Sequence, residues 1–204
     1  MIMSFTKETL KLAIDRIAAK IDPIGEEMNR LDGQLGDGDL GVTLVNGFRN
    51  LQEIKDDLPD DLGRAMFAMA KSVTAVSGSS FGTLLATALM AAGKQVKDTS
   101  EVEWAQLPTL LQAAQDAMIA RGGASLGDKT MLDSMDNLIK ALSGLQTPDE
   151  MLPAAQTAAK QTLDAFRDQP NKIGRARVYA EKSIGLDDPG MMAIARMIDC
   201  FAPQ

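Results

Sequence analysis

The sequence predicts an all-α fold of about eight antiparallel amphipathic helices, and three observations support this. Apolar residues recur three and four positions apart along almost the whole chain, the spacing of one helix face. No segment of useful length alternates polar and apolar residues as a half-buried strand does. Aromatic residues make up only 4% of the chain, whereas methionine and alanine are abundant. With 204 residues and no linker rich in proline or serine, one domain over residues 1–204 is expected.

Each expected helix is marked by its own apolar stripe, whose methionines we expect to fill the core. The second helix opens at Pro23, the third begins near Gly41, and Pro108 breaks or restarts the sixth. Residues 177–183 resemble a short turn of helix. The last helix begins at Asp188-Pro189, an acidic N-cap followed by proline at the first helical position. In chain order, the stripes run over residues 10–21, 24–31, 45–51, 62–76, 81–92, 107–118, 132–142, 151–166 and 194–201.

Composition excludes several classes of function. The net charge of −7 argues against general binding to nucleic acid or to anionic membranes. The chain has no histidine, so Ser-His-Asp catalysis, Cys-His catalysis and His-ligated zinc are impossible within it. The single Cys200 can form neither an internal disulfide nor an all-thiolate zinc site. Any bound metal therefore needs oxygen ligands, as Mg²⁺, Ca²⁺ and Mn²⁺ do. Without a membrane-length apolar run or a signal pattern, we expect a cytoplasmic protein.

Four glycine-rich breaks separate the helices, at residues 32–41, 77–82, 121–131 and 174–190. Alternate connections of an up-down bundle lie at the same end, so these breaks are expected to converge on one rim. The first break holds Asp32, Asp37 and Asp39, which would repel one another unless a divalent cation lay between them. A solvated acidic turn explains the same residues equally well.

The other breaks are each open to two interpretations. The Ser-Gly turn before Phe81 fits a phosphate cradle at a helix N-terminus, and it fits an ordinary N-cap. The segment 127–131 could place the Lys129 ammonium and a hydroxyl on a ligand, or it could start a helix with Asp128 as cap. Taken together, the four breaks describe a site for a metal-bridged polyphosphate, in which carboxylates hold metals and backbone amides complete the cradle.

Four spaced motifs, in this order, resemble the nucleotide-binding subunit or domain of dihydroxyacetone kinases, the DhaL family. They are L-D-x-x-x-G-D-G-D-x-G from residue 31, S-G-x-x-x-G-T from 77, R-G-x-x-x-x-G-D-K-T-M from 121 and G-R-A-x-x-x-x-E-x-S-I-G-x-x-D-P-G from 174. The resemblance implies a closed barrel of eight antiparallel helices that binds ADP or ATP with two Mg²⁺ at one end. It implies that Asp32, Asp37 and Asp39 hold the metals. It assigns nucleotide contacts to Leu40, Gly41, Val42, Thr43, Val76, Ser77, Gly122, Met131, Lys182, Asp188, Pro189 and Gly190.

The resemblance also has departures. The family usually has histidine where this chain has Leu40 and asparagine where it has Thr43, and Lys182 replaces an arginine. The metal aspartates are intact, so the expected chemistry remains phosphoryl transfer without a P-loop lysine. The departures suggest a paralogue that serves another ketose.

The implied partner is a separate DhaK-like subunit that holds the ketose covalently through a histidine, which this chain lacks. The phosphoryl donor is either ATP exchanged from solution or bound ADP that a phosphotransferase-system protein rephosphorylates, and the sequence leaves both open. The alternative function is a non-catalytic module that senses nucleotide and regulates a partner protein.

Overall fold

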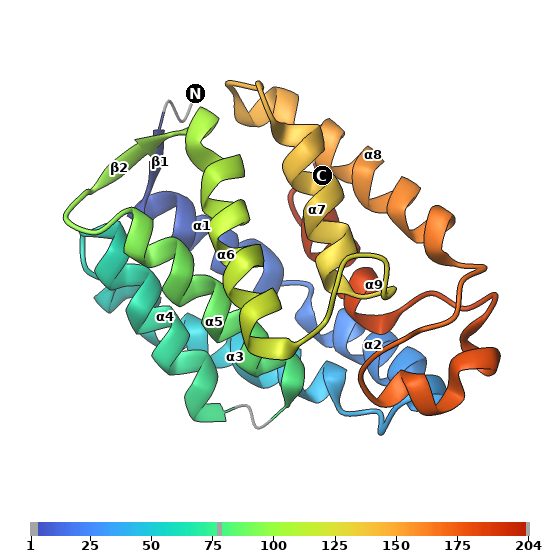
Figure 1. The fold of residues 1–204 in the computed structure, drawn as a ribbon. Helices are drawn as coiled ribbons and strands as arrows, with labels where there is room; N and C mark the ends of the chain where they lie inside the picture. The colour runs from blue at the N-terminus through green and yellow to red at the C-terminus, as the bar shows by residue number, and fades with distance from the viewer. Residues whose placement is uncertain (1–3, 77–78, 203–204) are drawn as a thin grey trace.

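The computed structural model describes residues 4–76 and 79–202, and helices dominate it (Figure 1). Short 3₁₀ turns lie at η1 (Lys55–Asp57), η2 (Trp104–Gln106) and η3 (Arg175–Ser183). The α-helices are α1 (Lys7–Ala18), α2 (Ile21–Leu35), α3 (Leu40–Ile54), α4 (Leu62–Val76), α5 (Ser80–Gln95), α6 (Leu107–Gly122), α7 (Met131–Leu142), α8 (Pro148–Phe166) and α9 (Pro189–Asp199).

The helices α2 to α9 form a closed ring. Each of them packs against the next one along the chain, and α9 packs back against α2. The first helix, α1, lies against α3. The predicted all-α fold is therefore confirmed. No helix within the described ranges combines the length and the apolar character that a membrane crossing requires.

The helix starts follow local signals in the sequence. At α8, the Thr147 hydroxyl accepts the Glu150 N–H, the Glu150 carboxylate accepts the Thr147 N–H, and Pro148 occupies the first turn. At α9, Asp188 caps the helix by accepting the Met191 N–H at 2.9 Å, as the Asp188-Pro189 pair predicted. These caps satisfy N–H groups that otherwise have no partner inside the helix.

The core runs along the inside of the ring and contains most of the predicted apolar stripes. Several of its methionines are almost completely inaccessible to solvent: Met28, Met118 and Met191 are exposed by 0%, 0% and 1%. Their flexible thioether side chains fill the space between helices, as expected.

The structure differs from the sequence expectations in two local details. The strands β1 (Ser4–Thr6) and β2 (Glu101–Glu103) pair antiparallel, although no strand was predicted, because three residues are too few to show an alternating pattern. In addition, α2 continues to Leu35, so the first break is shorter than residues 32–41. Asp32 therefore belongs to the last turn of a helix, and only the following residues form the loop.

Candidate functional site

A cavity of about 470 Å³ opens at the end of the ring where α3, α5, α7 and α9 begin. Its lining includes the first residues of these helices: Leu40 of α3, Ser80 of α5, Met131 of α7 and Pro189 of α9. The N-terminus of a helix carries a partial positive charge and unpaired N–H groups, so it attracts anions. Four such ends around one cavity, each from one of the four breaks, make a site suited to a polyanion.

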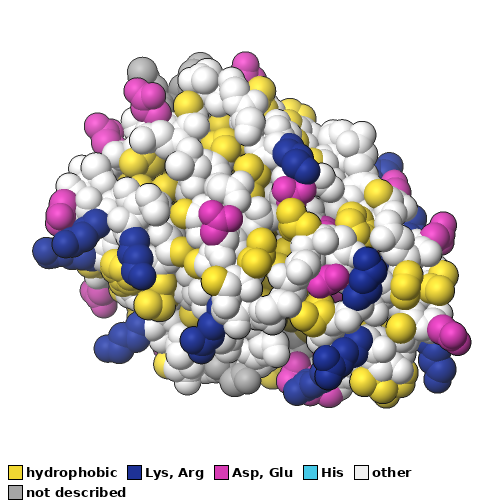
Figure 2. Space-filling model, in the orientation of Figure 1, with side chains coloured by type: hydrophobic (Ala, Val, Ile, Leu, Met, Phe, Trp, Pro, Cys, Tyr) yellow, Lys and Arg dark blue, Asp and Glu magenta, His cyan; other side chains and the backbone are white. Residues whose placement is uncertain are grey.

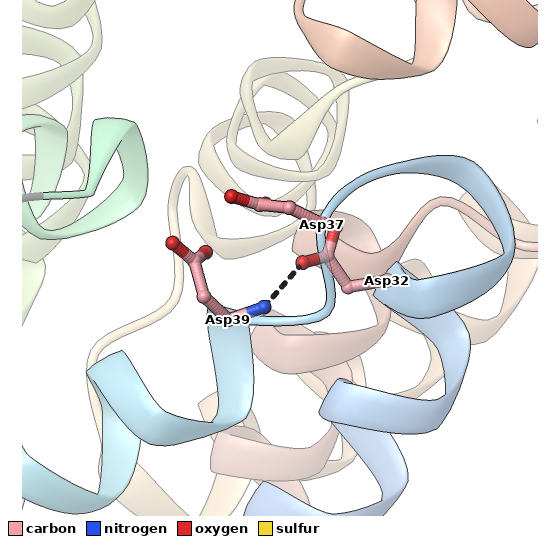
Figure 3. Close-up of side chains that lie close together, drawn as sticks. All are labelled: Asp32, Asp37 and Asp39. Atoms are coloured by element: carbon pink, nitrogen blue, oxygen red, sulfur yellow. Dashed lines mark hydrogen bonds between the residues drawn. The ribbon is translucent and has the colours of Figure 1, made fainter.

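The three predicted metal ligands lie together at this cavity, and Figure 3 shows them converging. One carboxylate oxygen from each of Asp32, Asp37 and Asp39 lies within 4.8 Å of the others. Asp32 accepts the N–H groups of Asp39 at 3.0 Å and of Leu40 at 3.3 Å. Between the aspartates, Gly38 has a φ of +76°, which favours glycine. The helical Asp32 therefore fixes the loop that carries the other two carboxylates.

The chemistry of this donor set fits a hard divalent cation. Three carboxylates supply the oxygen ligands that Mg²⁺ prefers, and Mg²⁺ usually completes its shell with water and substrate phosphates. Asp32 and Asp39 are half-buried, whereas Asp37 is exposed to the mouth of the cavity. The geometry thus leaves room for a ligand on the solvent side of the triad.

Arg175, at the start of η3, forms ion pairs with this acidic cluster. Its guanidinium contacts the Asp37 carboxylate directly and lies 3.8 Å from that of Asp39. The cluster is therefore partly neutralised by a cation from the fourth break. Arg175 was missed as a site residue, although it is the arginine of the G-R-A motif, and its place in that motif was the available signal.

The rest of the cavity wall is largely apolar. A flat aromatic ring could lie against such a wall, while charged groups at the mouth meet its substituents. Gly122 at the end of α6 belongs to this wall, and a Cβ there would press on Leu84 at 3.3 Å. The apolar lining residues are Leu35, Leu40, Phe81, Leu84, Met118, Ala124, Met131, Leu132, Ile173, Ala176 and Pro189.

Asp188, at the cap of α9, lines the cavity from the other side. Besides the Met191 N–H, its carboxylate accepts the Asn171 side-chain amide at 2.8 Å. Burial raises the pKa of Asp188 to about 6, although these hydrogen bonds and the nearby Lys129 ammonium favour the charged form. The site therefore contains a carboxyl group that titrates near neutral pH.

The structure brings most of the predicted site residues together. The predicted residues that line the cavity are Asp32, Asp37, Asp39, Leu40, Gly122, Met131, Asp188, Pro189 and Gly190.

The other predicted contacts lie elsewhere. Gly41 packs against Gly25 and Asn29, and Thr43 lines a small internal void behind α3. Val42 is 51% exposed, and Val76 ends α4 with a half-exposed side chain. Ser77 lies outside the described residues.

The exposed side chain of Lys182 does not line the cavity either. Its ammonium lies 5.6 Å from the centre of the Tyr179 ring. Among the described residues, Lys182 is therefore not one of those that line the cavity.

The third break starts a helix, as one of its two interpretations held, but the capping residue is a different one. Thr130, and not Asp128, caps α7 by accepting the Leu132 N–H, and Asp133 accepts the Thr130 N–H at 2.8 Å. The Lys129 ammonium turns away from the cavity and is completely buried among backbone carbonyls. It offers no cation to a ligand.

Comparison with known proteins gives consistent relatives. The chain is 33% identical over 190 residues to a D-erythrulose kinase of Mycolicibacterium smegmatis, which covers 90% of this chain and 33% of that enzyme. It is 28% identical over 186 residues to the ADP-binding subunit DhaL of the PEP-dependent dihydroxyacetone kinase of Escherichia coli, covering 87% of each. The chain thus spans about a third of the length of the erythrulose kinase but most of the DhaL subunit.

A solved structure shares the fold. The dihydroxyacetone kinase of Citrobacter freundii, crystallised in complex with AMP-PNP and Mg²⁺, aligns with a TM-score of 0.71 at 24% identity. The alignment covers 96% of this chain and 33% of that one. The model of the DAK2 domain matches residues 34–203, well over half of the sequence. The chain therefore belongs to the DAK2 domain family.

Proposed function

We propose that this chain is the nucleotide-binding part of a ketose kinase of the dihydroxyacetone kinase type, and that it binds ADP or ATP with two Mg²⁺ in the cavity described above. One observation carries the proposal: three carboxylates with oxygens within 4.8 Å of one another lie where four helix N-termini meet an apolar wall. The carboxylates suit the metals, the helix ends suit the phosphates, and the wall suits the base.

The names of the relatives support the same occupant. The Escherichia coli relative is named an ADP-binding subunit, and the Mycolicibacterium smegmatis relative is named a kinase of a four-carbon ketose. Dihydroxyacetone and erythrulose are both small ketoses, so the proposed substrate class is a short ketose, and the proposed reaction transfers a phosphoryl group to its hydroxyl.

In this proposal the residues of the chain act by positioning and by charge. Bound Mg²⁺ would neutralise the charge that spreads over the phosphoryl oxygens during transfer. Asp32 holds the acidic loop in place by accepting the N–H groups of Asp39 and Leu40. The carboxylate oxygens that would bind the metal are therefore preorganised. Arg175 lies beside the same carboxylates and supplies a cation at the mouth. No side chain of this chain is assigned as acid, base or nucleophile.

The ketose is proposed to reside on a separate DhaK-like subunit that covers the mouth of the cavity. Apolar side chains in η3 and directly after it are exposed to an unusual degree, with Val178 at 75% and Ile184 at 49%. Apolar and basic side chains both appear at the lower right of Figure 2, over the segment drawn red in Figure 1. A surface of this mixed character is typical of protein interfaces. The proposed phosphoryl donor is either ATP or a phosphotransferase-system protein.

The test is calorimetric titration with Mg-ADP of the wild-type protein, of Asp37→Asn and of Asp149→Asn. Asp37 lies in the triad, whereas Asp149 is an exposed aspartate in the first turn of α8. We expect Asp37→Asn to abolish Mg-dependent binding and Asp149→Asn to leave it unchanged. Unchanged binding in Asp37→Asn would remove the metal site from the proposal.

A coupled assay with a DhaK-like subunit then separates catalysis from sensing. Turnover with ATP, or with phosphoenolpyruvate and the phosphotransferase proteins, supports the kinase and identifies its donor. Tight Mg-ADP binding without turnover in either assay would instead favour the non-catalytic regulatory module.

A further inference from the structure

Lys129 has a completely buried side chain, exposed by 0%, between α6 and α7. Its ammonium donates to three backbone carbonyls: that of Arg167 at 3.0 Å, that of Gln169 at 2.7 Å and that of Ser183 at 2.8 Å. An ammonium has three protons, so all of them are used. The backbone of Lys129 has a φ of +62°, uncommon for a residue other than glycine, and this conformation directs the chain into the contact.

The three carbonyls belong to two chain segments, which are also joined by the Gly185 N–H donating to the Arg167 carbonyl at 2.9 Å and by the Arg167–Asp187 ion pair. Those of Arg167 and Gln169 follow the end of α8, where carbonyls lack helical partners and carry partial negative charge. The carbonyl of Ser183 ends η3. Between them runs the segment 170–183, which supplies Ile173, Arg175 and Ala176 to the cavity wall. One ammonium therefore joins both ends of the segment that forms this wall.

Further hydrogen bonds extend the contact to the cap of α9. The Lys129 carbonyl accepts the Asn171 side-chain amide at 2.8 Å, and the same amide donates to Asp188 at 2.8 Å. The Asn171 N–H donates to the Ser183 hydroxyl at 2.8 Å. The cap residue Asp188 and the neighbouring Pro189 both line the cavity. Lys129 thus connects the third break of the sequence to the whole fourth break.

This arrangement is costly for stability alone. Burial lowers the pKa of Lys129, and no carboxylate lies within hydrogen-bond distance of its ammonium among the described residues. A buried charge whose hydrogen-bond partners are all neutral carbonyls is usually less favourable than a well-packed apolar side chain, and the nearby charges of Asp188, Asp187 and Asp168 offset only part of the burial. Residues that break local rules in this way tend to lie at functional sites.

We propose that Lys129 is a positioning residue, whose buried ammonium holds the segment 170–188 in place as one wall of the nucleotide cavity. The inference rests on the proposed function only in naming a nucleotide as the occupant. Lys129 touches neither the cavity nor its occupant. It acts through Arg175 and the cap of α9, and its ammonium makes no direct hydrogen bond to the acidic loop between α2 and α3.

The experiment compares Lys129→Met with Lys172→Met as a matched control. Methionine keeps most of the length of the Lys129 side chain and suits its buried position, but it removes the three donors. Lys172 lies in the same segment and also donates to a backbone carbonyl, that of Gly127 at 2.7 Å, but its side chain is exposed. Lys129→Arg is a third variant, which keeps the charge and offers N–H donors in a different, planar geometry.

We expect amide hydrogen exchange over residues 170–188 of Lys129→Met to become at least about tenfold faster, whereas exchange in α4 and α5 stays as in the wild type. Its affinity for Mg-ADP should fall by about tenfold or more, whereas Mn²⁺ alone should bind at least as tightly as before. Lys172→Met should match the wild type in all three measurements, and Lys129→Arg should restore part of the Mg-ADP affinity. If Lys129→Met does not fold, Lys129→Arg carries the test with a smaller but equally localised effect.

Two results would overturn the inference. One is unchanged exchange over 170–188 in the Lys129 variants, and the other is faster exchange spread evenly over α4 and α5, which would make Lys129 a general stabilising residue. Failure of the wild-type protein to bind Mg-ADP would refute the proposed function instead. The exchange measurement would still decide whether Lys129 holds the segment, so the two failures are distinguishable.

Discussion

Arg196 of α9 and Glu27 of α2 form a two-point ion pair that closes the ring of helices. Two guanidinium nitrogens donate to the two carboxylate oxygens, at 2.7 and 2.8 Å, from helices at opposite ends of the sequence. The pair lies at the junction between the last helix and the first helix of the ring. Because α9 begins at the cavity and α2 ends there, this pair joins the two helices that bring Asp188 and Asp32 to the cavity.

Arg196→Gln should lower the free energy of unfolding at pH 7 by about 1 kcal/mol, a moderate value because both side chains are partly exposed. The Arg196 hydrogen bonds hold the pKa of Glu27 below its usual 4.5. A carboxyl with a lowered pKa stabilises the fold above its usual pKa, and this contribution is lost as the pH falls through the lowered value. Urea unfolding should therefore show a gap between wild type and variant at pH 7 that closes in acid. Arg49→Gln, which breaks the more exposed pair with Asp22, is the control and should cost less. An equal gap at both pH values would contradict this account.

Gly41→Ala should displace the start of α3 and weaken Mg-ADP binding together with stability. A Cβ at Gly41 would overlap the carbonyl oxygen of Gly25, and it would lie 2.6 Å from the Asn29 side-chain oxygen. The expected loss is about 2 kcal/mol or more, the range of overpacked sites. Gly47→Ala, in the same helix, meets nothing within 4 Å and should stabilise the protein by about 0.5 kcal/mol or more. Thermal unfolding of both variants checks the pair, and similar behaviour of the two would refute the close approach of α2 and α3.

Arg175→Gln should raise the affinity for Mn²⁺ in the absence of nucleotide by several-fold. The guanidinium pairs with Asp37 and lies near Asp39, so the metal must compete with a positive charge for the same carboxylates. Removing that charge favours the metal. Titration followed by electron paramagnetic resonance measures free Mn²⁺ directly. Arg177→Gln changes an exposed arginine two positions along and should leave the affinity as it is. A weaker Mn²⁺ site in Arg175→Gln would show that Arg175 supports the metal instead of competing with it.

The sequence predicted more of the fold than of the contacts within the site. Apolar periodicity located the helices because helix formation and core packing follow the same spacing. The aspartate triad was predicted because its residues lie close together in the chain. Arg175 was missed as a partner of Asp37, because their meeting depends on how η3 folds back over a loop far away in the sequence. The burial of Lys129 was equally hidden, since a sequence does not show where backbone carbonyls converge.

Asp188→Asn should change how stability depends on pH. The carboxyl of Asp188 has a pKa of about 6 in the folded protein against an ordinary 3.8. The folded state therefore binds this proton more tightly than the unfolded state, so its stabilising effect is complete below pH 3.8 and is lost as the pH rises through about 6. At most, about 3 kcal/mol is lost across this window, because each unit corresponds to about 1.4 kcal/mol. Asparagine keeps an oxygen for the Met191 N–H but carries no charge.

Unfolding in urea at closely spaced pH values between 4 and 7 measures this effect. Wild type should lose stability relative to Asp188→Asn as the pH rises, whereas Asp149→Asn, at an exposed position, should run parallel to wild type. Because Asp188 caps the helix whose first residues line the cavity, a negative charge there also opposes a nearby phosphate. Mg-ADP should therefore bind wild type more tightly at pH 5.5 than at pH 7.5 through this residue, and Asp188→Asn should remove that part of the pH dependence. A wild-type curve parallel to that of Asp188→Asn across the window would contradict this account. It would show that the Asp188 carboxyl has an ordinary pKa because its hydrogen bonds offset the effect of burial.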